Sequence, residues 1–153
     1  MKFAKLILCA LSVVAICGMS SAAVKVSAVT SKGKVAVIKE GGSRSGGYTI
    51  KQFPAEFKGL EVVSVPRGNP NKAGNPYSFT ISAPATVYIM IDARQVKNYK
   101  LEGWTQTKLT ATWIAGKSTY KDVIFKKDFA AGTVAIPANP RSGLPCLAVI
   151  KGK

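Results

Sequence analysis

The clearest pattern of hydrophobic and polar positions lies in the middle of the chain, in the sequence YSFTISAPATVYIMIDAR. Apolar and polar side chains alternate through two runs, Tyr77–Ser82 and Ala85–Asp92, which are separated by Ala83-Pro84. Alternation with period two in stretches rich in β-branched and aromatic residues is typical of β-strands. We therefore expect two antiparallel strands that pair with each other across the proline turn.

Shorter runs of the same kind occur along the rest of the chain. Val24–Val29 and Lys34–Lys39 predict a hairpin, Thr133–Ile136 and Cys146–Ile150 predict a closing hairpin, and the glycine- and serine-rich stretch 41–47 predicts a flexible loop. Further strand candidates are Tyr48–Ile50, Leu60–Val65, Leu109–Ile114 and Tyr120–Phe129. About eight or nine short strands without a long amphipathic helix predict an all-β fold, an antiparallel β-sandwich or jelly roll.

The first 23 residues depart from this pattern. Two lysines precede an apolar run from Leu6 to Ile16, and small residues follow at positions 20–23. This is the order of a secretory signal peptide, and we expect cleavage after Ala22 or Ala23. The remaining residues 24–153 would form one secreted domain, in the periplasm, at the cell surface or outside the cell, without stable insertion in a membrane. The alternative is an uncleaved anchor.

The cysteine and histidine content removes several kinds of chemistry. Cys9 and Cys17 belong to the signal segment, and the bulky Ile16 before Cys17 disfavours lipid attachment there. Cys146 is then single, and we interpret it as a small buried residue of the closing strand. The chain has no histidine, which excludes Ser-His-Asp and Cys-His mechanisms and the commonest metal ligand. We expect no cofactor and no bound metal.

Positive charge dominates the composition. The formal net charge is +15, and removal of Lys2 and Lys5 with the signal segment leaves 15 − 2 = +13. The lysines are scattered rather than clustered, which is typical of residues that keep strand edges soluble. The alternative is attraction toward anionic polymers such as acidic polysaccharide, cell-wall polymer or extracellular DNA. Because the lysines fall on both alternating positions of the strands, they would point to both faces of the sheets. We therefore do not expect one basic face that binds nucleic acid.

Three stretches resemble a known family. FTISAPATVYIMIDAR, then Gly103-Trp104-Thr105, then KDFAAGTV at 127–134 are similar to an accessory β-sandwich module of secreted bacterial proteins that degrade polysaccharides. The family pattern is ATVYVxxDxR, W-T and KDFPAGTV, and the resemblance covers roughly residues 77–150. Ala130 stands where the family usually has proline. The resemblance implies a β-sandwich that takes part in carbohydrate binding or domain packing.

An enzymatic alternative depends on paired carboxylates. A glycosidase needs two of them facing one cleft, and Asp92 and Asp128 are the candidate pair among seven acidic residues. Each has a local explanation, because Asp92 and Arg94 share one side of a strand end and Asp128 begins a turn. We therefore expect a protein that is not an enzyme.

The preferred hypothesis is a secreted, non-catalytic binding or structural module that binds polysaccharide, in particular an acidic one. Aromatic rings stack on sugars and planar polar groups bridge their hydroxyls. Tyr88 and Trp113, which we place on the exposed side, are therefore further candidates beside the predicted ligand-binding residues. Packing in the core is the alternative for both tryptophans. A small secreted lyase or hydrolase using Asp92 and Asp128 and a cell-surface scaffolding subunit are the competing functions. The predicted ligand-binding residues are Asp92, Arg94, Tyr99 and Trp104.

Overall fold

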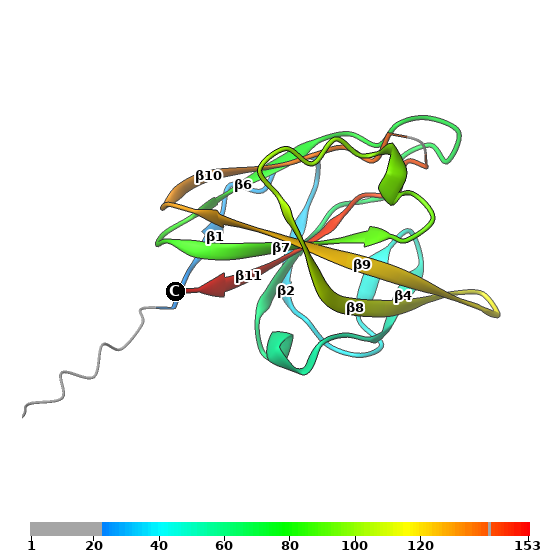
Figure 1. The fold of residues 1–153 in the computed structure, drawn as a ribbon, viewed down its shortest axis with the longest axis horizontal. Helices are drawn as coiled ribbons and strands as arrows, with labels where there is room; N and C mark the ends of the chain where they lie inside the picture. Colours follow the sequence, from blue (N-terminus) through cyan, green and yellow to red (C-terminus); the bar gives the residue numbers. More distant parts are fainter. Residues whose placement is uncertain (1–22, 141) are drawn as a thin grey trace, which may run out of the picture.

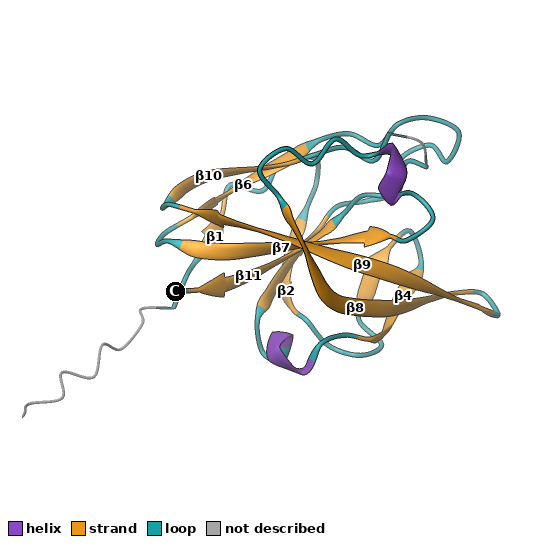
Figure 2. Ribbon diagram, viewed as in Figure 1, coloured by secondary structure: helices purple, strands orange, loops and turns teal. Residues whose placement is uncertain are grey.

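The computed structural model describes residues 23–140 and 142–153, so the expected signal segment lies almost entirely outside the described residues. The described residues form β-strands and two short 3₁₀ helices (Figures 1 and 2). Within the described part the strands are β1 Val26–Ser27, β2 Lys34–Val37, β3 Ser43–Ser45, β4 Tyr48–Gln52, β5 Glu61–Ser64, β6 Tyr77–Ile81, β7 Ala85–Asp92, β8 Thr105–Ala115, β9 Ser118–Phe129, β10 Gly132–Ile136 and β11 Leu147–Gly152, and the 3₁₀ helices are η1 Ala55–Phe57 and η2 Val96–Asn98.

The strands form two antiparallel sheets. One has three strands in the order β1-β6-β10, and the other has eight in the order β2-β5-β11-β7-β9-β8-β4-β3. The two sheets pack as layers, which confirms the predicted all-β, sandwich-like class (Figure 1). No helix in the described residues has the length and apolar character needed to cross a membrane.

The predicted strand partners are wrong at three places. The runs 77–82 and 85–92 become β6 and β7, which lie in different sheets: β6 pairs with β1 and β10, while β7 pairs with β9 and β11. The expected hairpins at 24–39 and 133–150 are also divided between the two sheets. Alternation reports which face of a strand is buried, and it carries no information about the neighbouring strand. A hairpin does form between β8 and β9, where Ala115 pairs with Ser118.

The layer between the sheets holds the first apolar core. Val87, Ile89 and Ile91 of β7 face Phe79 and Ile81 of β6 across this layer, and all five are at most 1% exposed. The interlayer core explains why β6 and β7 do not pair, because each strand must present its apolar face to the opposite sheet.

A second core lies on the opposite face of the eight-stranded sheet. Tyr88 and Met90 of β7 pack there with Phe57, Ile124 and Leu147. Both faces of β7 are therefore covered, and Tyr88 is only 8% exposed. The expectation of an exposed Tyr88 is wrong, since a central strand between two cores has no solvent side.

The eight-stranded sheet coils around this second core. Ile38, beside β2, and Ile50 of β4 belong to the same apolar cluster although they come from opposite ends of the strand order. Ser45 Oγ of β3 donates a hydrogen bond of 3.1 Å to the carbonyl of Val65, just beyond β5. The two edges of the sheet thus approach each other and leave a narrow seam between β2 and β3.

Candidate functional site

Asp92 and Arg94 form the centre of the predicted site. Asp92 ends β7, and Arg94 follows it by two residues, so the guanidinium returns to the carboxylate: Nη2 lies 2.6 Å from Oδ2, and Nε lies 3.0 Å from Oδ1. Burial by itself raises the pKa of the Asp92 carboxyl, but hydrogen bonds from the Arg94 side chain and backbone outweigh it and hold the pKa below its usual value. The Asp92 side chain is 2% exposed and the Arg94 side chain is 57% exposed.

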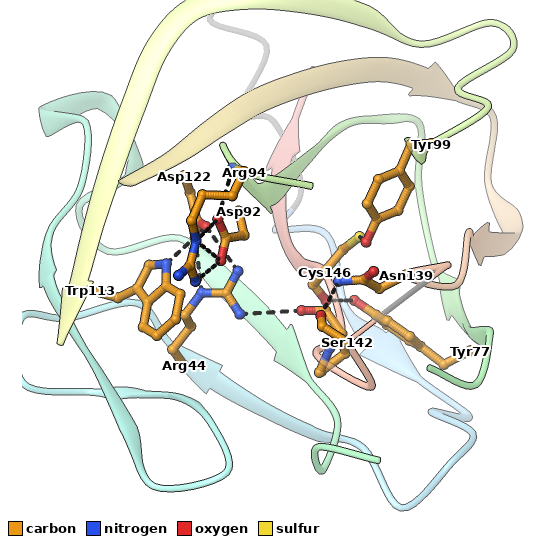
Figure 3. A network of polar contacts seen from close by, with 11 residues as sticks. Arg44, Tyr77, Asp92, Arg94, Tyr99, Trp113, Asp122, Asn139, Ser142 and Cys146 are labelled. Carbon is orange, nitrogen blue, oxygen red and sulfur yellow. Dashed lines mark hydrogen bonds and ion pairs between the residues drawn. The ribbon is translucent and has the colours of Figure 1, made fainter. Parts of the chain in front are cut away.

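A second ion pair, which the sequence analysis did not identify, lies directly beside this one. Asp122 of β9 is the cross-strand partner of Asp92. Arg44 of β3 donates to it from Nε and Nη2, both at 2.9 Å, and the Trp113 indole donates at 3.0 Å (Figure 3). Both members of the pair are buried, with side chains 1% and 2% exposed. Two ion pairs therefore lie next to each other at one end of the second core.

One sequence signal pointed to this buried pair. Asp122 occupies the same strand parity as Ile124, whose side chain faces the second core, so a carboxylate there requires a buried partner. The partner was hidden because Arg44 lies within the glycine- and serine-rich stretch 41–47, where a loop was expected and β3 forms instead.

A row of stacked side chains continues from Arg94. The Arg94 guanidinium lies 4.1 Å from the Tyr120 ring centre, Tyr120 stacks on Trp113 at 4.6 Å, and Trp113 lies 5.0 Å from Tyr48. The Arg67 guanidinium lies over the Tyr48 ring, 5.3 Å from its centre. The ring faces are occupied by one another, so this row does not present a stacking platform to a sugar. Trp113 is 2% exposed, which agrees with the core interpretation.

Tyr99 and Trp104 lie elsewhere. The segment between η2 and β8 covers the interlayer core, and both side chains are half-buried against it. The Cys146 thiol donates to the Tyr99 hydroxyl at 3.3 Å, and burial raises the pKa of Tyr99 and raises that of the Cys146 thiol to about 11. The Trp104 ring lies 5.8 Å from Phe129. The structure therefore brings Asp92 and Arg94 together but does not join Tyr99 and Trp104 to them in one surface.

Asp128 is remote from Asp92. Along the β7–β9 pair, Asp92 lies opposite Asp122 and Thr86 lies opposite Asp128. Six residues of strand separate the two levels, roughly 20 Å at about 3.3 Å per residue. Glycosidase carboxylates are about 5–10 Å apart, so these two do not face a common bond. Asp128 is exposed and binds Lys153 at 2.8 Å, and the Lys153 hydrogen bond lowers the pKa of its carboxyl.

Most of the positive charge lies at the surface. Fourteen of the sixteen lysines in the described residues are exposed, and the other two are half-buried. By contrast, only four of the seven carboxylate residues are exposed, because Asp92 and Asp122 are buried and Glu61 is half-buried. Within the described residues, no group of three or more acidic, cysteine or histidine side chains is placed to hold a metal ion.

A scan against protein-family models and searches of curated proteins and of solved structures returned no match. The resemblance of residues 77–150 to an accessory module therefore rests on the quoted motifs alone and stays a hypothesis.

Proposed function

We propose that the protein is a secreted, non-catalytic module that binds acidic polysaccharide. The observation that carries this proposal is the imbalance of exposed charge, fourteen exposed lysines against four exposed carboxylates in the described residues. Two carboxylates are bound internally to Arg44 and Arg94, so they do not offset the surface lysines at close range. A positive field of this kind attracts polyanions and weakens with added salt.

The scaffold suits binding better than catalysis. The two cores fix the sheets, and the predicted carboxylate pair is divided between the ends of β7 and β9. Lysines on long, flexible side chains give adaptable contacts with a repeating chain of charges, which does not require one deep pocket. The resemblance to modules of polysaccharide-degrading proteins supports the same class of ligand.

The test is affinity electrophoresis of the chain beginning at residue 24 in gels that contain polygalacturonate, or the same polymer fully methyl-esterified. The esterified polymer keeps the sugar backbone and removes the charge, so it is the matched control. We expect retardation by polygalacturonate alone, weakened at least about tenfold between 20 and 200 mM salt. Equal mobility in both gels would contradict the proposal.

Three further readouts separate the alternatives. Retardation by double-stranded DNA as strong as by polygalacturonate would show a general polyanion binder. Stable self-association in size-exclusion chromatography would favour the scaffolding function, and new reducing ends from the polymer would show an enzyme. N-terminal sequencing of exported protein should begin at Ala23 or Val24 if the signal segment is removed as expected.

A further inference from the structure

Two adjoining hollows lie at the seam of the eight-stranded sheet. One has a volume of about 250 Å³ and the other about 160 Å³, and both are lined by Lys32, Val65 and Pro66. Because they share these residues, the two hollows adjoin, and we treat them together as one groove beside β2, β3 and the end of β5. We call it the cationic groove, and its defining residues are Lys32, Lys34, Ser45, Ser64, Arg67 and Gly143.

Among the described residues, three cations and no carboxylate line the groove. Lys32, Lys34 and Arg67 line it, and neither hollow has an aspartate or glutamate in its lining. Serine hydroxyls and the Asn75 amide supply neutral polar groups beside them. Like charges held near one another repel, and in this groove no acidic side chain offsets that repulsion. An anionic ligand would do so.

Arg67 is held in place by an aromatic ring. Its guanidinium covers the Tyr48 ring at 5.3 Å, and its Nη1 donates to the Tyr48 hydroxyl. Its Nε is buried and has no hydrogen-bond partner within the residues that the structure describes. A guanidinium carries five N–H donors in a fixed fork, and Arg67, fixed in the lining of the groove, is therefore suited to a carboxylate or sulfate through its terminal nitrogens.

The walls of the groove are fixed by the backbone. Ser31 and Lys32 both have φ of 56°, and Gly33 N donates to Thr30 O at 3.0 Å, which closes a tight turn. Consecutive left-handed residues other than glycine are strained. Such strain persists only where its surroundings impose it, and here it places Lys32 over the groove.

A backbone clasp forms the opposite wall. Gly68 N donates to Gly143 O at 2.7 Å, and Gly143 N donates to Lys72 O at 2.9 Å. The approach is so close that a Cβ on Gly143 would lie 2.4 Å from Asn69 O. The groove is thus bounded by two segments far apart in the chain, and its shape depends on their contact.

The geometry points to a binding site in the cationic groove for one acidic sugar unit, with the carboxylate or sulfate near Arg67 and Lys32 and the sugar hydroxyls near the serines and Asn75. The choice of a sugar as the ligand rests on the proposed function, whereas the choice of an anion rests on the groove itself. Each hollow is smaller than a typical small-molecule site of about 300–1,000 Å³, which suits a single unit of a polymer rather than a long segment.

The test is an NMR titration of ¹⁵N-labelled protein, residues 24–153, with galacturonate, with galactose as the neutral analogue, and with sulfate. We expect saturable shifts of the Ser31, Lys32 and Gly68 amides with galacturonate and none with galactose. Lys32→Gln should weaken galacturonate binding about tenfold, the effect of one charge-assisted hydrogen bond. Lys117→Gln, which removes an exposed lysine at the β8–β9 turn, is the matched control and should change the affinity less than about twofold.

The outcomes separate the site from the proposed function. Saturable shifts by both galacturonate and sulfate, with affinity reduced in Lys32→Gln, support the anion site. Galacturonate binding without sulfate binding assigns the site to the sugar acid. Arg67→Lys, which keeps the charge but loses the fork, should weaken binding in either case. Unsaturable shifts spread over many lysines, or equal losses in Lys32→Gln and Lys117→Gln, would overturn the site. If Lys32→Gln keeps full retardation by polygalacturonate, the groove is not the binding site, but the proposed polymer binding is still supported. If no acidic polymer binds but sulfate saturates the groove, the anion site is supported and the proposed polymer binding is rejected.

Discussion

Arg44 and Asp122 form a two-pronged ion pair in the interior of the protein. Arg44 Nε and Nη2 donate to the two oxygens of Asp122, both at 2.9 Å, and neither side chain is more than 2% exposed. Seventy-eight residues separate them in the chain, and the pair connects β3, at one edge of the coiled sheet, to the central strand β9. Removal of water from both charges is costly, and their attraction offsets that cost only while both partners are present.

Arg44→Met should therefore destabilise the fold strongly. The substitution leaves the Asp122 carboxylate buried with only the Trp113 indole as a side-chain donor, and we expect a loss of about 3–5 kcal/mol in the free energy of unfolding. The double variant Arg44→Met/Asp122→Leu should recover most of that loss. Urea denaturation measures all three proteins.

Lys153→Gln is the control, because its ion pair with Asp128 is exposed and its removal should leave the free energy of unfolding nearly unchanged. A double variant as unstable as Arg44→Met would contradict the assignment of the loss to an unpaired charge.

The Asp92 ion pair should make stability depend on pH. Arg94 holds the pKa of Asp92 below its usual value in the folded state, so the stabilisation is complete above the unfolded-state pKa of about 3.9 and is lost as the pH falls through the folded-state value. Asp92→Asn removes this titration. The difference in unfolding free energy between wild type and Asp92→Asn should be largest near pH 6 and should shrink toward pH 2.

The pKa of Asp122 is shifted in the opposite direction from that of Asp92, because burial raises it although Arg44 opposes the shift. Because wild type and Asp92→Asn both contain Asp122, its titration contributes to both. Urea denaturation of the two proteins at pH 2, 3, 4 and 6 therefore isolates the contribution of Asp92. A difference that stays constant over this range would show that the carboxylate charge of Asp92 does not contribute.

Trp104→Ala should affect stability rather than binding. The ring packs on Phe129 and on the interlayer core, where it is half-buried, and its loss should cost about 2 kcal/mol. Retardation by polygalacturonate should change less than about twofold. Thermal unfolding and affinity electrophoresis on the same protein separate the two effects. If Trp104→Ala abolishes retardation by polygalacturonate but leaves the stability unchanged, Trp104 contributes to ligand binding and not to packing.

Gly143→Ala should open the backbone clasp at the cationic groove. Gly143 has φ of +55°, and an added Cβ would lie 2.4 Å from a backbone oxygen. Gly116→Ala is the matched control, because Gly116 has φ of +60° and no other atom within 4 Å of the added Cβ. Both variants incur the left-handed backbone cost of about 1 kcal/mol, so a lower melting temperature for Gly143→Ala than for Gly116→Ala measures the clash. Equal melting temperatures for the two variants would mean that the backbone around Gly143 accommodates the added Cβ without loss of stability.

Some contacts of the candidate site could be predicted from the sequence, and others could not. Asp92 and Arg94 were predictable as a pair because they lie two residues apart at the end of a strand run, although the structure joins them through the turn after β7, where Gln95 N donates to Asp92 O at 2.8 Å. Arg67 and Tyr48 were not, because their contact joins the segment after β5 to β4 through the coiling of the sheet. Lys32 is one lysine among sixteen in the described residues, and only its place beside Arg67 distinguishes it.

The amino-acid sequence alone determined the class of the fold, since period-two alternation in short runs requires pleated strands with one face buried, and it determined the surplus of positive charge. The tertiary structure decided which strands pair, because apolar runs such as β6 and β7 satisfy their burial across two layers rather than side by side. It also decided where cations meet without carboxylates, since charges far apart in the chain become neighbours only when the sheet coils and its edges converge at the seam.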